Sequence, residues 1–116
     1  MFVDSVLASD NASATTCFCV LAGHPLVDKM GLTEGGLLEN MAQTSVFIGV
    51  DDISHAAPKH GMVAAVLTME IMRRPAQGEE VLTTATVVEQ AMGIKKIEAS
   101  VSVSGEIIAS ATFKVV

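Results

Sequence analysis

The chain has 116 residues, half of them apolar, which is enough for one domain with its own core. Only 17% of the residues are charged and the net charge is −6, which argues against a general nucleic-acid-binding role. No apolar run could span a bilayer, and Asp4 stands where a signal peptide would carry positive charge. We therefore expect one cytoplasmic domain over residues 1–116, with neither a nucleic-acid nor a membrane partner. The low charged fraction also suggests that a second subunit covers some apolar surface.

Two strands are predicted first, Phe2–Leu7 and Thr15–Leu21, separated by a turn cluster. Cys17 and Cys19 are two residues apart, so they should share one strand face, too close along the chain for an ordinary disulfide. We expect that face to point inward, and we expect no metal site because the pair lacks further ligands. The following segment, Gly23–Gly36, is long for a loop in a small domain, which favours a functional role.

A helix is predicted from about Glu34, with Thr33 as its N-cap and Gly49 near its end. Small or apolar side chains would cover most of its circumference, so the helix should be buried on most sides. Only a sheet that curls around the helix can bury it in this way. The apolar positions recur at intervals of three and four: Leu37, Leu38, Met41, Ala42, Ser45, Val46 and Ile48.

The second half of the chain predicts strands only. After an irregular connection at Asp51–His60, short breaks separate strand-like runs, and short breaks favour antiparallel neighbours. The expected fold class is α+β, with an antiparallel sheet of five or six strands wrapped around one helix. The expected strands are Met62–Met72, Val81–Val88, Ile94–Val103 and Ile107–Val115.

Polar residues on the predicted helix are the first candidates for chemistry. Glu39 and Gln43 are four residues apart and share a face. Apolar walls around Glu39 would raise its pKa and let the carboxylic acid donate a proton, although a solvated stripe is an equally good interpretation. Backbone N–H groups of Gly35 and Gly36 at the helix N-terminus could hold an oxyanion, or the two glycines could simply ease entry into the helix. His24 could be a general base or a structural loop histidine.

Several of these segments resemble 3-hydroxyacyl-acyl-carrier-protein dehydratases of the FabZ type. Leu37–Gln43 is similar to the family's central-helix motif, and Phe2–Leu7 is similar to its opening strand. Further along, Arg73–Pro75 with Gly78–Glu80 resembles the strand and turn after the helix, and Ser104–Thr112 resembles the closing hairpin.

The resemblance implies a hot-dog fold, a homodimer whose sheets join edge to edge, and an acyl tunnel at the interface. It also implies a role in fatty acid biosynthesis, by removal of water from a 3-hydroxyacyl thioester to give a trans-2-enoyl thioester. The acyl chain would arrive on acyl carrier protein or coenzyme A, and no cofactor would be needed. By this resemblance Glu39 is the acid and His24 the base, while Gly35 or Gly36, together with Gln43, contacts the substrate.

The chain departs from the family around its base. Gly23-His24-Pro25 lacks the family's aromatic residue, and Gly35-Gly36 stands where Pro-Gly is expected. Another alignment places Asp28–Gly31 opposite the catalytic histidine, which would then be absent. Two alternatives therefore stay open: a non-catalytic acyl-binding or assembly subunit, and an acyl-thioesterase. Carrier docking would need a basic patch, for which the candidates are Arg73, Arg74, Lys95 and Lys96, unless these are ordinary solvated strand ends.

Overall fold

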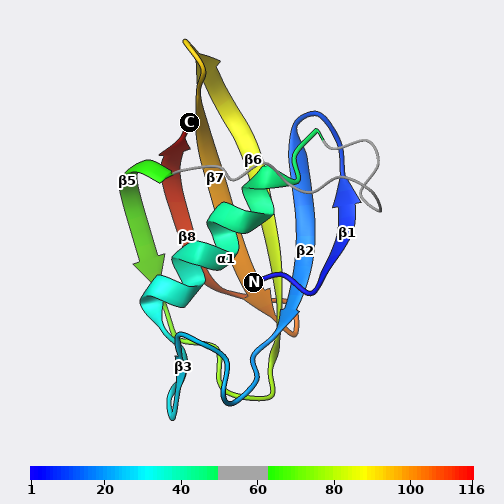
Figure 1. Ribbon diagram of the computed structural model, residues 1–116, viewed down its shortest axis with the longest axis vertical. Helices are drawn as coiled ribbons and strands as arrows, with labels where there is room; N and C mark the ends of the chain where they lie inside the picture. Colours follow the sequence, from blue (N-terminus) through cyan, green and yellow to red (C-terminus); the bar gives the residue numbers. More distant parts are fainter. Residues whose placement is uncertain (50–62) are drawn as a thin grey trace.

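The computed structural model describes residues 1–49 and 63–116 (Figure 1). Its main sheet has six antiparallel strands in the order β1-β2-β6-β7-β8-β5, and a short hairpin, β3-β4, stands apart from it. The predicted Asp51–His60 connection lies outside the described residues. The elements are β1 Ser5–Ser9, β2 Ser13–Cys19, β3 Val27–Asp28, β4 Gly31–Leu32, α1 Glu34–Val46, β5 Val63–Ile71, β6 Glu80–Ala91, β7 Ile94–Val103 and β8 Glu106–Val115.

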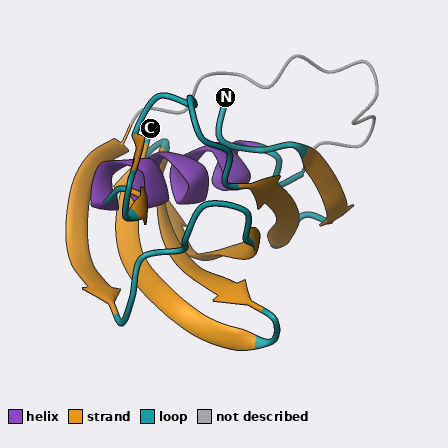
Figure 2. Cartoon of the chain, turned by 90° about the horizontal axis from the view of Figure 1, so that it is seen from below, coloured by secondary structure: helices purple, strands orange, loops and turns teal. Residues whose placement is uncertain are grey.

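The sheet curls around the helix, as the burial pattern of the helix predicted (Figure 2). Helix α1 lies against the inner face of the sheet and contacts β2, β6, β7 and β8. The predicted α+β arrangement of one helix and an antiparallel sheet is confirmed for the described residues. Strand β5 is the first strand after the helix. It pairs only with β8 among the described strands, so it forms one edge of the sheet.

The helix begins where its capping residues predicted. Thr33 has an extended backbone, and its hydroxyl accepts a hydrogen bond from the Gly36 N–H at 3.1 Å. Glu34 carries negative charge in the first turn, where the helix dipole favours it. The helix ends at Val46, and Gly49 follows with a φ of 78°.

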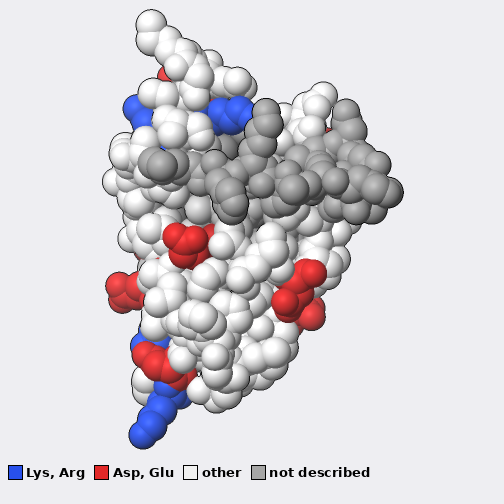
Figure 3. Space-filling view, in the orientation of Figure 1, with Lys and Arg blue, Asp and Glu red and all other residues white. Residues whose placement is uncertain are grey.

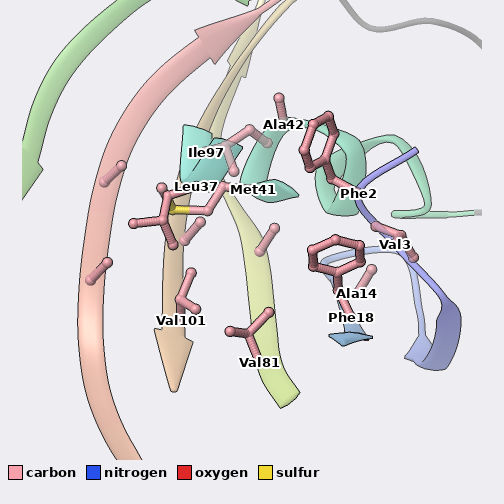
Figure 4. Packing of buried hydrophobic residues seen from close by; sticks show 14 of the residues in the cluster. Phe2, Val3, Ala14, Phe18, Leu37, Met41, Ala42, Val81, Ile97 and Val101 are labelled. Atoms are coloured by element: carbon pink, nitrogen blue, oxygen red, sulfur yellow. The ribbon is translucent and has the colours of Figure 1, made fainter. Parts of the chain in front are cut away.

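The core fills the space between the helix and the inner sheet face (Figure 4). Leu37 and Met41 of the helix pack among fully buried residues of the strands, such as Phe18, Ile97 and Phe113. Burying such side chains is the main favourable contribution to folding.

Two predictions for the N-terminal part are wrong. The first strand begins at Ser5 instead of Phe2, because Phe2 and Val3 leave the sheet and enter the core. Cys17 and Cys19 are half-buried free thiols on the outer face of β2, whereas Phe18 between them points inward. Small residues occupy both faces of this strand, so its alternation alone does not distinguish the inner face.

The predicted loop over residues 23–36 contains the β3-β4 hairpin, which Arg74 ties to the body. Its guanidinium donates to the Leu32 carbonyl at 2.9 Å and to the Asp28 carboxylate at 2.6 Å. The pKa of Asp28 is lowered, first by the hydrogen bond from the Met30 N–H and then by Arg74. The neighbouring Arg73 pairs with Glu79 at 2.7 Å, so both arginines have structural partners.

Candidate functional site

Glu39 lies on the exposed side of helix α1, next to a residue that is completely buried, Asn40. The buried stripe of the helix contains Leu37, Met41 and Thr44 and faces the sheet. Among the described residues no hydrogen bond or ion pair holds the Glu39 carboxylate. The apolar surroundings that we expected for this group are therefore not provided by the described part of a single chain.

The two glycines at the start of the helix have different roles. Gly36 is buried, donates its N–H to Thr33, and has no room for a side chain because a Cβ atom would lie 2.4 Å from Leu32 Cδ1. Gly35 is exposed, and a Cβ atom there would meet only the Thr33 hydroxyl at 4.0 Å. No hydrogen bond within residues 1–49 and 63–116 occupies the Gly35 N–H, so this glycine is the one that can offer an amide to a ligand.

His24 is half-buried, and its imidazole holds the N-terminal residues. Its Nε2 lies 2.8 Å from the Met1 carbonyl oxygen and its Nδ1 lies 2.7 Å from the Pro25 carbonyl oxygen. The ring meets Phe2 and Phe18 edge-on, at centroid distances of 4.5 and 5.2 Å. Both carbonyls are acceptors, so a neutral imidazole can donate to only one of them. The structure shows no contact between His24 and Glu39.

Gln43 and Asn40 hold the same N-terminal segment from the helix side. The Phe2 N–H donates to Gln43 Oε1 at 2.7 Å, and Asn40 Nδ2 donates to the Phe2 carbonyl at 2.6 Å. Figure 4 shows the Phe2 ring close to the helix, above Phe18. His24 and Gln43, two of the candidates from the sequence, therefore converge with Asn40 on Met1 and Phe2.

Asn40 is also the centre of a buried polar network that sequence reasoning missed. Its Oδ1 accepts from the Thr83 hydroxyl at 2.5 Å, and its backbone carbonyl accepts from the Thr44 hydroxyl at 2.8 Å. Thr44 in turn lies 2.7 Å from the hydroxyl of Thr16. An asparagine within the apolar stripe was the available signal, because a buried amide requires partners. The network joins the helix to β2 and β6.

No family model and no curated protein matches the chain. Among solved structures, the chain is similar to smu.793 from Streptococcus mutans bound to acetyl-CoA, with 14% identity, a TM-score of 0.77, and coverage of 99% of this chain and 89% of that one. The PaaI protein of the E. coli phenylacetic acid degradation operon matches with 14% identity, a TM-score of 0.75, and coverage of 96% and 80%. The dehydratase heterocomplex ApeI:P from Xenorhabdus doucetiae matches with 13% identity, a TM-score of 0.74, and coverage of 99% and 81%.

These likenesses concern the fold. Together with the helix and the six-stranded antiparallel sheet, they show that the chain has the hot-dog fold. Among the described residues no helix is long and apolar enough to cross a membrane, and no three potential ligands gather around a metal position.

Proposed function

We propose that this protein acts on acyl thioesters as a hot-dog dimer and removes water from a 3-hydroxyacyl thioester, with Glu39 as the proton donor. The observation that carries the proposal is the placement of Glu39 on the open side of a helix that is otherwise largely buried, with the available Gly35 amide one turn earlier. A carboxylic acid and a backbone N–H on one helix can serve a leaving hydroxyl and a thioester oxygen, respectively.

Gly35 supports this proposal because the fold does not explain its identity. Packing requires Gly36, and Gly31 has a left-handed backbone, but Gly35 has neither constraint. A side chain at this position would cover the first turn of the helix, where backbone N–H groups attract a developing negative charge. We therefore assign the oxyanion contact to Gly35 and a packing role to Gly36.

In this proposal His24 takes the α-proton after a change in its contacts. When Nδ1 donates to the Pro25 carbonyl, Nε2 carries the lone pair that a general base needs. The Met1 carbonyl lies against that same Nε2, so the N-terminal residue has to move before the imidazole can accept a proton. Gln43 Oε1 accepts from the Phe2 N–H, and no hydrogen bond within the described residues occupies its Nε2, so this amide group would contact the substrate.

A second chain supplies the walls that Glu39 lacks. Strand β5 has an open edge with exposed Val66 and Leu67, and pairing with β5 of another copy would extend the sheet. Exclusion of water between the two copies would bring Glu39 into the apolar surroundings where a carboxylic acid keeps its proton.

One alternative is favoured by a specific observation. His24 is held between two rings with both nitrogens on carbonyl oxygens, an arrangement typical of a structural residue. The chain would then be a non-catalytic acyl-binding or assembly subunit, and one similar structure is that of a dehydratase heterocomplex. An acyl-thioesterase, in which Glu39 would activate water, needs no histidine. Loss of thioester without any enoyl intermediate would identify that reaction.

Hydration of a trans-2-enoyl thioester, which is the reverse reaction, tests the proposal. We expect the purified protein to remove the conjugated-enoyl absorbance and Glu39→Gln to lower the rate by about 100-fold or more, because general acid catalysis contributes a factor of this size. Glu34→Gln, an exposed acid at the start of the same helix, is the control and should keep the activity. Equal rates for wild type and Glu39→Gln would remove Glu39 from the reaction.

The edge-to-edge dimer is tested by light scattering. We expect a dimer at micromolar concentration and a shift to monomer in Leu67→Lys, because a charge on an edge strand opposes pairing with another strand. Leu82→Lys is the matched control, since Leu82 has 41% exposure against 47% for Leu67 but lies on the central strand β6. A monomeric wild-type protein, or dissociation caused equally by both variants, would contradict pairing through β5.

A further inference from the structure

The hairpin between β6 and β7 projects from one end of the molecule (Figure 1). Its turn consists of Met92 and Gly93, with φ angles of 55° and 76°, as in a type I′ turn. Met92 is 100% exposed. A left-handed backbone costs a residue such as methionine about 1–2 kcal/mol, and asparagine is the usual choice at this position. Met92 is therefore unfavourable for the isolated fold both in its backbone and in its exposure.

Other apolar side chains accompany Met92 at the tip. Val88 is 46% exposed and Ile94 is 39% exposed, and Ala91, which pairs with Ile94, is also exposed. The register of β6 shifts between Val87 and Glu89, and such a bulge redirects the side chain at its extra residue, Val88. The tip thus presents apolar groups that do not belong to the core.

Lysines lie directly behind this apolar tip. Lys95 and Lys96 follow Ile94, and Lys114 of β8 stands opposite Lys96 in the ladder. These are three of the six lysines and arginines in the described residues, and Figure 3 shows basic side chains at the hairpin end of the molecule. Like charges directly opposite each other destabilise a sheet. Unlike Arg73 and Arg74, none of the three lysines has an ion-pair partner among residues 1–49 and 63–116.

Two acidic side chains of the described residues lie on the β6-β7 hairpin close to these lysines. Glu89 stands opposite Lys96, and Glu98 lies two residues farther from the tip. Among the described side chains, three lysines and these two glutamates leave one positive charge at the hairpin end (3 − 2 = 1), whereas the net charge of the whole chain is −6. Within residues 1–49 and 63–116, the positive charge of the hairpin end makes it suited to an anionic surface.

From these features we infer that the β6-β7 hairpin is a peripheral membrane contact, in which Met92 and its apolar neighbours enter the headgroup region of an anionic bilayer while Lys95, Lys96 and Lys114 meet lipid phosphates. The lysines lie two to three residues behind the turn, roughly 7–10 Å along the strands. Interfacial segments bury their apolar groups to a depth of about 5–10 Å, with basic side chains at the headgroups.

The shape of the hairpin favours a bilayer over a folded acidic protein. A stable protein interface buries about 800 Å² on each partner, which a projecting two-residue turn does not offer. Lipid headgroups, by contrast, can surround both faces of a projecting hairpin. The sequence predicted no membrane partner because no segment could span a bilayer, but this contact would need no spanning segment. The inference is independent of the acyl-thioester chemistry.

Sedimentation with lipid vesicles tests the inference. We expect the full chain to sediment with vesicles of phosphatidylcholine mixed with phosphatidylglycerol and to stay in solution with phosphatidylcholine alone. Replacing Lys96 and Lys114 by glutamine should weaken binding about fivefold for each lysine, and added salt should weaken it further. Met92→Asn should weaken binding about tenfold because it removes the buried apolar side chain.

Met92→Asn also separates membrane binding from folding, because asparagine suits the left-handed turn and should leave the protein at least as resistant to urea as wild type. Met30→Asn and Lys29→Gln in the exposed β3-β4 turn are matched controls and should bind vesicles like wild type. Wild-type protein that ignores anionic vesicles, or sediments equally with and without Met92, overturns the inference. Retention on immobilised polyglutamate without vesicle binding also overturns it and points to an acidic protein partner.

Discussion

Gly31→Ala is expected to lower the free energy of unfolding by about 2–6 kcal/mol, as measured by urea denaturation. Gly31 has a φ of 105°, a backbone conformation that is strained for any residue with a side chain. In addition, a Cβ atom would lie 1.9 Å from the Pro75 carbonyl oxygen. That oxygen accepts a hydrogen bond from the Leu32 N–H at 2.9 Å, so it cannot move away without breaking the link. A loss of this size is a large part of the 5–15 kcal/mol that stabilises a typical domain.

Gly78→Ala is the matched control for Gly31→Ala. Its φ of 89° imposes the same kind of backbone strain, but no atom lies within 4 Å of the added Cβ. We expect it to cost only about 1–2 kcal/mol. If the two variants lose equal stability, the contact with Pro75 contributes nothing, and the close packing of β4 on the Pro75 loop has been misjudged.

The effect of Gly31→Ala should extend to the candidate site. Gly31 and Leu32 lead directly into the helix cap at Thr33 and then into Gly35. A displaced β4 would therefore move the Gly35 N–H relative to Glu39. We expect any enoyl-thioester hydration to fall in Gly31→Ala even at temperatures where the variant is folded.

The elements with local signals could be predicted from the sequence. Strand β7 has the predicted bounds Ile94–Val103, because Met92-Gly93 and Ser104-Gly105 adopt left-handed backbones on both sides of it. The start of the helix at Thr33 and Glu34 could also be predicted from the sequence. The hydroxyl of an N-cap residue accepts a hydrogen bond from a residue only three positions away, so the signal is local.

Contacts between distant parts of the chain could not be predicted in this way. The position of His24 depends on Met1, 23 residues away, and that of Asn40 depends on Phe2 and Thr83. None of these three hydrogen bonds leaves a periodic signal in the sequence. The same limitation explains why Phe2 was assigned to a strand: its apolar character fits both a strand and a segment that packs over a helix.

Asn40→Ala should also destabilise the protein strongly, by about 2–5 kcal/mol. The side chain is completely buried and satisfies two groups, the Thr83 hydroxyl and the Phe2 carbonyl. Its removal leaves both groups without a partner in a buried region and opens a cavity, and each unsatisfied group costs about 1–3 kcal/mol. The N-terminal segment should loosen as well, which hydrogen exchange at the Phe2 amide can detect.

A double-mutant cycle with Thr83→Val separates the polar contact from the packing. Valine keeps the shape of threonine but removes the hydroxyl, so Thr83→Val leaves only Asn40 Oδ1 without its donor. The cycle compares Asn40→Leu, Thr83→Val and the variant that carries both changes. The double variant removes both partners together, and replacing both partners by apolar groups costs less than the sum of the two single changes. We expect a coupling of about 1–2 kcal/mol in urea denaturation. If the losses in the free energy of unfolding are additive, the two side chains act independently. Packing alone would then fix the rotation of the helix about its axis, and hence the direction in which Glu39 points.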